Sequence, residues 1–230
     1  MEKKKRIIIL TDFTNTCYQS LTYGLEFCRH YGYQPEILHV ETPSCNPFVD
    51  SIERQKVSNL AELYNSKFGL GASVVIRNGV LSSVITDEVR QGGFSLIILG
   101  THGKKGFQTV TGSAAARIIS SQDIPIIVVQ SRKFSPIDKV LLPVPNGAGS
   151  PFSGMVGELL KEMGVQWKIF HRDDTFDHNL PRQAVTYADD NGFGLILCNL
   201  AKSINNDNAG CASIVDQILF NIPQIPVMCV

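Results

Sequence analysis

The chain has 230 residues, enough for one large domain or two small ones, and its 43% hydrophobic and 18% charged residues are typical of a globular protein. Its 21 basic residues balance 21 acidic ones, so the overall charge gives no support to a nucleic-acid or membrane-surface role. No apolar run approaches the roughly 18 residues needed to cross a bilayer, so we expect no contact with a membrane.

Strands alternate with helices along the first half of the chain. The continuous apolar run at residues 6–11 predicts a buried strand, and the amphipathic run at residues 16–31 predicts a helix. The remaining elements of this half are strands at residues 36–40, 72–76, 94–99 and 124–129 and helices at residues 50–68, 80–91 and 113–120. Such alternation indicates a parallel sheet with right-handed crossovers, which is an α/β fold.

The second half repeats this plan in a shorter form. Residues 93–99 match residues 192–198 at an offset of 99, whereas residues 6–12 match residues 139–145 at an offset of 133. The difference of 34 residues is about the length of one helix plus one strand with their loops. We therefore expect two doubly wound domains, residues 1–132 and 133–230, with one α–β unit missing from the second.

The elements expected in the second half follow from the same periodicities. They are strands at residues 139–142, 165–170, 193–198 and 224–230 and helices at residues 151–163, 182–190 and 213–220. The linker at residues 131–136 is short, so we expect the two domains to pack together.

A glycine-rich loop follows the expected strand at residues 94–99. It reads Gly-Thr-His-Gly from Gly100 to Gly103, and Gly112-Ser113 then opens an Ala-rich helix pattern. Glycines let backbone N–H groups approach a ligand, and a helix N-terminus adds unpaired donors and partial positive charge. The pattern therefore indicates a phosphate cradle, although it matches neither the P-loop nor the dinucleotide-binding spacing.

The motifs together resemble the universal stress protein family. They are Thr11-Asp12-Phe13-Thr14 after the first strand, Leu38-His39-Val40 closing the second, Gly79, the Gly100 to Gly103 turn and Gly112-Ser113. The resemblance covers residues 5–130 and extends to residues 138–230 in outline. It implies a five-stranded parallel sheet in the order 3-2-1-4-5 in the first domain, and an ATP-binding function in stress response or signalling.

The resemblance also implies roles for individual residues. Asp12 would accept a hydrogen bond from the adenine amine, and Thr11 and Val40 would flank the base. His39 is expected to be a core residue that ends a buried strand.

The phosphate side of the implied site lies in the glycine-rich segment. Gly100 and Gly103 would leave room for ribose and phosphate, while Gly112, Ser113 and Ala114 would offer backbone N–H groups, with the Ser113 hydroxyl as a further donor. Mg²⁺ is the companion ion expected beside crowded phosphates.

Each of these residues has a purely structural alternative. Asp12 and Ser113 are residue types that cap helices, and the glycines fit a tight turn. Eight residues separate Gly103 from Gly112, whereas the ATP-binding pattern has nine. A nucleotide-independent scaffold is therefore the alternative function. A slow hydrolase is a third, but no general base or nucleophile stands in a persuasive place, so we expect no enzyme.

The second half lacks the nucleotide motifs. Pro145 stands where Asp12 would be, and Asn199 begins a segment without the glycine pair, so we expect at most one site per chain. The last strands of the two domains would pair within the chain and cover two sheet edges. The missing unit would expose the strand at residues 165–170, which carries Trp167, and a homodimer through that edge is a further expectation.

The cysteines and the N-terminus indicate the compartment. Six cysteines show neither a Cys-x-x-Cys pair nor metal-ligand spacing, which favours reduced thiols. The apolar run after the basic start spans only residues 7–10, shorter than the about 7–15 residues of a signal peptide. We therefore expect a cytoplasmic protein.

Overall fold

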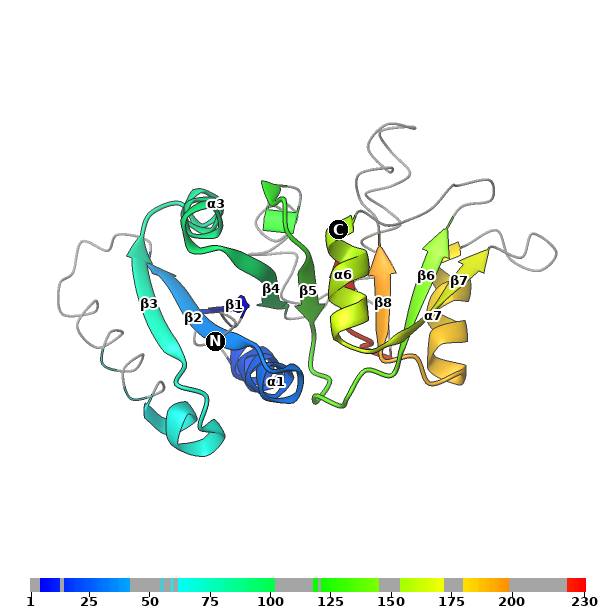
Figure 1. The fold of residues 1–230 in the computed structure, drawn as a ribbon, viewed down its shortest axis with the longest axis horizontal. Helices are drawn as coiled ribbons and strands as arrows, with labels where there is room; N and C mark the ends of the chain where they lie inside the picture. The colour runs from blue at the N-terminus through cyan, green and yellow to red at the C-terminus, as the bar shows by residue number, and fades with distance from the viewer. Residues whose placement is uncertain are drawn as a thin grey trace.

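One nine-stranded sheet runs through the whole molecule in the computed structural model (Figure 1). The strand order is β3-β2-β1-β4-β5-β9-β8-β6-β7. The structure describes residues 5–12, 15–41, 55, 59, 62–101, 118–119, 121–144, 154–171, 180–198 and 223–230. Within this part of the chain, no helix has the length and apolar character that a membrane span requires.

The first half has the strand order 3-2-1-4-5 that the sequence predicts, and all its strand pairs are parallel. Its strands are β1 (Arg6–Thr11), β2 (Gln34–Glu41), β3 (Ser73–Asn78), β4 (Phe94–Gly100) and β5 (Ile126–Val129). Figure 1 shows its helices α1 (Asn15–Tyr31) and α3 (Leu81–Gly92) on opposite sides of these strands. Because both faces are covered, β1 is buried from Ile7 onward, as its continuous apolar run predicts.

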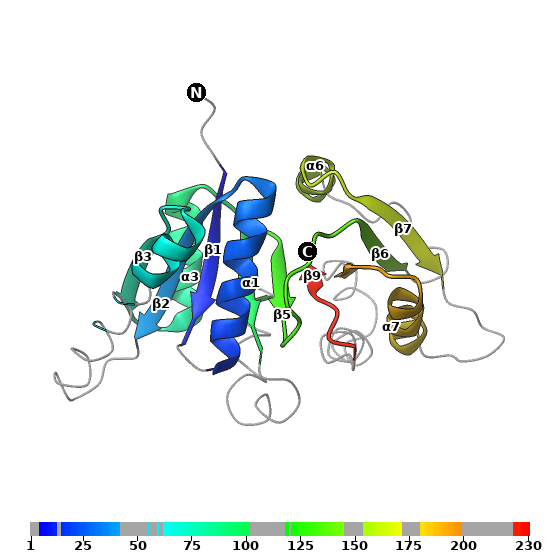
Figure 2. The same ribbon diagram turned by 90° about the horizontal axis from the view of Figure 1, so that it is seen from below.

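The second half repeats the arrangement without a counterpart of β3. Its elements are β6 (Lys139–Val144), α6 (Gly154–Glu162), β7 (Gln166–His171), α7 (Leu180–Asp190), β8 (Leu195–Cys198) and β9 (Val227–Cys229). Figure 2 shows α6 and α7 on opposite sides of β6 and β7. Among the described residues, the order β9-β8-β6-β7 ends one strand earlier than that of the first half, as expected for a copy that lacks one α–β unit.

Contacts at the start of each half show that the repeat is structural. The Arg6 guanidinium lies 4.3 Å from the centre of the Phe94 ring and donates to the carbonyl of Gly92. The Lys139 ammonium lies 6.0 Å from the centre of the Phe193 ring and donates to the carbonyl of Asn191. Phe94 and Phe193 are 99 residues apart, and so are Gly92 and Asn191, as the sequence offset requires.

The two halves meet where β5 pairs with β9. This pairing is antiparallel, with Ile127 opposite Met228, whereas every other strand pair in the sheet is parallel. The carboxyl ends of the strands in the second half therefore lie at the opposite edge of the sheet from those in the first half. A second tie is made by the Tyr31 hydroxyl, which donates to the carbonyl of Ile137 and accepts from its N–H.

Several elements end at other residues than the sequence patterns suggest. The strands expected to begin at residues 124 and 224 begin at Ile126 and Val227, each directly after a proline. A proline has no N–H, and Pro125 and Pro226 contribute only a carbonyl to the ladder, so regular pairing starts one residue later. The helix expected at residues 213–220 lies outside the described residues, and the one at residues 113–120 is described only at residues 118 and 119, which are helical.

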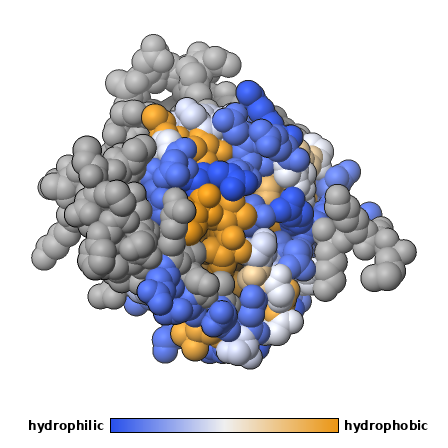
Figure 3. Space-filling view, turned by 90° about the vertical axis from the view of Figure 1, so that its left-hand side faces the viewer, coloured by the Kyte–Doolittle hydropathy of each residue, from blue (hydrophilic) through white to orange (hydrophobic). Residues whose placement is uncertain are grey.

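The outer edge of the first half is apolar. Figure 3 shows hydrophobic side chains exposed among polar ones on this side of the molecule. Val74, Val75 and Ile76 of β3 are partly exposed, and Val80 is 68% exposed. Both outer strands of the sheet, β3 and β7, pair with one described strand each.

Candidate functional site

The candidate site lies at the carboxyl ends of the first five strands. In an open parallel sheet a ligand binds where the strand order reverses, because the crossovers there leave on opposite faces and open a crevice. Here the reversal falls between β1 and β4. Asp12 follows β1 directly, and Gly100 ends β4 with Thr101 after it.

Backbone contacts hold the strand ends in register at this edge. His39 Nδ1 of β2 lies 2.9 Å from the carbonyl oxygen of Thr11 in β1. The N–H of Gly79 donates to the carbonyl of Glu41 at 3.1 Å, and the N–H of Thr101 donates to the carbonyl of Val129 at 2.9 Å. These contacts tie β1 to β2, β2 to β3 and β4 to β5 at their carboxyl ends.

The structure describes four of the eight residues proposed for the nucleotide. Asp12 is exposed, Val40 is half-buried, and Thr11 and Gly100 are buried. All four lie at the carboxyl ends of the neighbouring strands β1, β2 and β4. The other four proposed residues, Gly103, Gly112, Ser113 and Ala114, lie outside the described residues.

Two buried polar residues at this edge escaped the sequence reasoning. Thr101 is 2% exposed and its hydroxyl has no hydrogen-bond partner, and Glu41 is also buried. A buried hydroxyl without a partner is costly, so an orphan at a strand end marks a place where a ligand group would be favourable. The sequence could have indicated these two residues only by their position, because Glu41 ends one apolar strand and Thr101 directly follows another.

The matching edge of the second half is chemically different. Its strands end in Val144, His171, Cys198 and Cys229, and Cys198 lies opposite Cys229 in the β8–β9 ladder. Burial raises the pKa of the Cys198 thiol to about 12, which leaves it neutral and unreactive at neutral pH. No carboxylate lies at these described strand ends.

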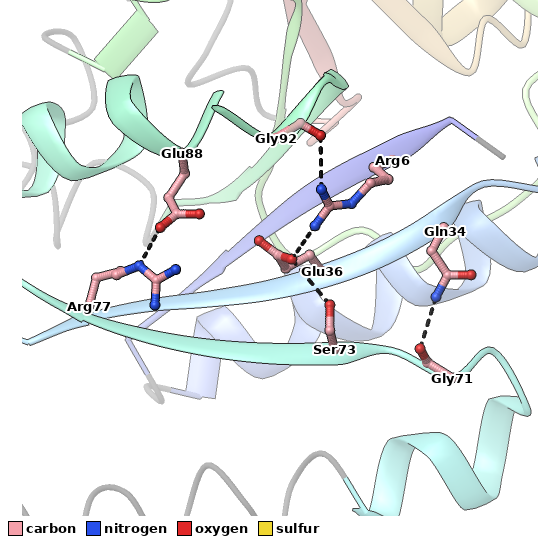
Figure 4. Close-up of polar contacts among 8 residues, drawn as sticks. All are labelled: Arg6, Gln34, Glu36, Gly71, Ser73, Arg77, Glu88 and Gly92. Carbon is pink, nitrogen blue, oxygen red and sulfur yellow. Dashed lines mark hydrogen bonds and ion pairs between the residues drawn. The ribbon is translucent and has the colours of Figure 1, made fainter. Parts of the chain in front are cut away.

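A second polar cluster lies at the amino ends of β1, β2 and β3. Arg6 forms a 2.5 Å ion pair with the buried carboxylate of Glu36, and the Ser73 hydroxyl donates to the same carboxylate at 3.2 Å (Figure 4). Arg6 and Ser73 thus satisfy the Glu36 carboxylate within the protein, and the cluster lies at the opposite edge of the sheet from Asp12. We assign it a structural role.

The described residues offer no ready-made metal site. They contain no group of three or more His, Cys, Asp or Glu side chains that could hold a metal ion. At the carboxyl edge, Asp12 is the exposed carboxylate, so a divalent cation here would depend mainly on oxygen atoms brought by a ligand.

Comparison with known proteins agrees with the architecture. The structure is similar to that of a universal stress protein from Archaeoglobus fulgidus, with 14% identity, a TM-score of 0.69 and coverage of 97% of this chain and 95% of the other. It is also similar to a functionally unknown protein from Pseudomonas aeruginosa, with 10% identity, a TM-score of 0.54 and coverage of 99% and 92%. At these identities the likeness is one of fold.

Other comparisons cover about half of the chain. A universal stress protein family protein from Arabidopsis thaliana, solved with AMP bound, matches with 18% identity and a TM-score of 0.42 over 56% of this chain and 92% of its own. No curated protein sequence matches the chain. The model of the universal stress protein family matches residues 4–130, which is more than half of the chain. The chain belongs to the universal stress protein family.

Proposed function

We propose that residues 1–132 bind an adenine nucleotide, ATP, at the carboxyl ends of β1 and β4. Two observations carry this proposal: the exposed carboxylate of Asp12 directly follows β1, and the buried, unpartnered hydroxyl of Thr101 directly follows β4, on the two strands between which the strand order reverses. One group suits a base edge and the other suits a ribose or phosphate oxygen. Family membership supports the same assignment.

The proposed roles divide between the two sides of the crevice. Asp12 accepts from the adenine amine, with Thr11 and Val40 beside the base. Gly100 leaves space for the ribose, and Gly103, Gly112, Ser113 and Ala114 supply the space and N–H groups for the phosphates. Mg²⁺ accompanies the phosphates rather than binding a dedicated set of side chains.

Binding without turnover is the function that this site supports. The carboxyl edge offers a carboxylate for base recognition, and His39 is buried with Nδ1 against a backbone carbonyl rather than presented to a ligand. We infer that nucleotide binding changes partner choice in a stress or signalling response. The second half, residues 133–230, acts as a built-in partner of the first through β5 and β9.

The test is isothermal titration of the whole protein with ATP, with and without Mg²⁺, and with GTP and inorganic tripolyphosphate as comparison ligands. Loss of a base contact of about 1.4 kcal/mol weakens binding tenfold. We expect Asp12→Ala to weaken ATP binding by at least that factor while leaving tripolyphosphate binding unchanged. Asp123→Ala, an exposed carboxylate before the amino end of β5, is the matched control.

The phosphate side is tested by Gly112→Val, with Gly154→Val at the open start of α6 as its control, because a Cβ at Gly154 meets no atom within 4 Å. Gly112→Val is expected to weaken both ATP and tripolyphosphate. Wild-type protein that binds no ATP at millimolar concentration contradicts the proposal and favours the nucleotide-independent scaffold. An Asp12→Ala protein that is less stable but binds ATP normally assigns Asp12 to helix capping.

A further inference from the structure

Among the described strands, β7 differs from its first-half equivalent β2 in what lies at its outer edge. In the first half, the equivalent strand β2 pairs with β1 on one side and β3 on the other. Tyr64 and Phe68 from the helical residues 62–68 join the core cluster on the same side as Ile37 of β2. In the second half, β7 pairs with β6 alone among the described strands.

One face of β7 carries two apolar side chains that are exposed or partly exposed, Trp167 and Ile169. Trp167 is 51% exposed, and Ile169, two residues later on the same face, is only partly buried against the core of α6. A tryptophan exposed to this extent on an edge strand is a typical sign of an interaction surface. Lys168 points to the other face, where its ammonium donates to the Tyr187 hydroxyl at 2.6 Å, so its charge is held against α7.

The direction of the backbone groups of β7 follows from one hydrogen bond. The N–H of Gln166 donates to the carbonyl of Asp138 and therefore points toward β6. Successive residues of a strand point their N–H and C=O groups to opposite sides, so those of Ile169 point away from β6. The outer edge of β7 therefore presents the backbone N–H and C=O groups of Ile169, near the middle of the strand.

We propose that β7 pairs antiparallel with β7 of a second copy of this chain, with Ile169 on the two-fold axis. An antiparallel pair of identical strands has its axis perpendicular to the sheet, so opposite residues share a face and their numbers differ by an even number. Centring on Ile169 lets the two Ile169 backbones exchange hydrogen bonds. Trp167 then lies opposite His171 of the second copy, beside the central isoleucine pair.

The neighbouring register is disfavoured by charge. Shifting the centre to Lys168 would place the two Lys168 side chains directly opposite each other, and like charges in such a pair are destabilising. In the register centred on Ile169, Lys168 lies opposite Phe170 of the second copy. No like charges then lie opposite each other at this position.

The symmetry of the pairing and the existing β5–β9 pair both favour a second copy of this chain as the partner of β7. Pairing of β7 with itself is isologous and closes after two chains, whereas pairing of β7 with the other outer strand, β3, is heterologous and would build a ring or an open filament. The β5–β9 pair shows that edges of two such halves join antiparallel in this sheet. The inference concerns the second half and is independent of nucleotide binding in the first.

The test is the mass of the whole protein by light scattering at increasing concentration, read together with fluorescence from its single tryptophan. We expect twice the chain mass of 25.3 kDa, and a blue shift and loss of iodide quenching of Trp167 as the dimer forms. Ile169→Pro removes an outward N–H without removing a bond to β6, and is expected to give a folded monomer. Ile76→Pro, on β3, is the matched control.

The control sits at an equivalent place on the other outer strand. The N–H of Gly79 points to β2, so by alternation the N–H of Ile76 points outward from β3. Trp167→Glu is a second variant, on an exposed side chain, in case Ile169→Pro does not fold; it too is expected to give a monomer. A wild-type protein that stays monomeric at about 100 μM with Trp167 fully quenchable overturns the proposal. So does a dimer or larger assembly lost on Ile76→Pro and kept on Ile169→Pro.

Discussion

Arg6 and Lys139 occupy equivalent positions at the start of β1 and β6, but only Arg6 faces a buried carboxylate. Glu36 lies on β2 opposite Ile8, whereas its counterpart on β7 is Lys168, opposite Leu141. The first half therefore contains an ion pair that the second half has replaced by contacts of two lysines with Phe193 and Tyr187. Substitutions at this position are therefore expected to change the free energy of unfolding by different amounts in the two halves.

Replacing Arg6 is expected to destabilise the protein far more than replacing Lys139. Arg6→Met leaves the Glu36 carboxylate buried without its cation, which costs on the order of 3 kcal/mol. Lys139→Met removes an exposed contact and is expected to cost less than about 1 kcal/mol. Urea denaturation of both variants measures the difference, and equal losses would mean that Glu36 is solvated in solution.

The glycines at positions 24 and 157 are equivalent in the repeat and are expected to respond to alanine with opposite signs. A Cβ at Gly157 of α6 meets nothing within 4 Å, so Gly157→Ala is expected to stabilise the helix by about 1 kcal/mol. A Cβ at Gly24 of α1 would lie 2.8 Å from the end of the buried Ile9 side chain. Overpacking of about 1–3 kcal/mol outweighs the helix propensity there.

Thermal or urea unfolding of the two alanine variants distinguishes packing from propensity. The expected order of stability is Gly157→Ala, then the wild type, then Gly24→Ala. If Gly24→Ala were as stabilising as Gly157→Ala, α1 would not approach β1 as closely as the structure has it.

The protein is expected to lose stability as the pH rises above 9. Burial raises the pKa of the Cys28 and Cys198 thiols from 9.0 to about 12, and burial also raises the pKa of Tyr23 and Tyr33 above 10.0. Between the unfolded and folded pKa values the unfolded chain binds fewer protons than the native one, so the free energy of unfolding falls with pH from 9 through 12.

Urea midpoints measured from about pH 7 to pH 11 check this alkaline loss. The double variant Cys28→Ala, Cys198→Ala should show a shallower fall just above pH 9, where the thiols of the unfolded chain begin to lose their protons. In the native wild type both thiols should resist a thiol reagent at neutral pH and react once urea unfolds the chain. A flat profile up to pH 11 would contradict the assigned burial.

Tyr31→Phe is expected to loosen the connection between the halves. The Tyr31 hydroxyl makes two hydrogen bonds to the backbone of Ile137, and its loss leaves a part-buried N–H without a partner, at a cost of about 1–3 kcal/mol. Relative to the wild type, Tyr31→Phe is expected to speed up amide hydrogen exchange more in β6 than in β1. Tyr187→Phe, which removes a hydroxyl bonded to an exposed lysine, serves as control and should change exchange little.

The sequence predicted the architecture because its signals are internal and repeated. The offsets of 99 and 133 residues locate the missing α–β unit without reference to any structure, and the strand order ending at β7 agrees with them. The strand starts were harder to predict. Ile124 and Ile225 look like strand residues by composition, but the prolines after them delay regular pairing to Ile126 and Val227.

The candidate site was predictable in position more than in detail. Asp12, Val40 and Gly100 can be placed at one edge from strand polarity alone. Burial of Thr101 and Glu41 depends on tertiary packing at the strand ends, which no local pattern encodes. The contact of His39 with the Thr11 carbonyl likewise depends on the β1–β2 register.

The junction of β5 and β9 lies within one polypeptide, and this frees the two sides to diverge. In an assembly of identical subunits, a substitution beside such a junction is duplicated on both sides at once. Here Ile127 and Met228 face each other as separately encoded residues, so each flank can change alone. Covalent tethering keeps the local concentration of one side high for the other, so contacts too weak to hold free subunits together suffice.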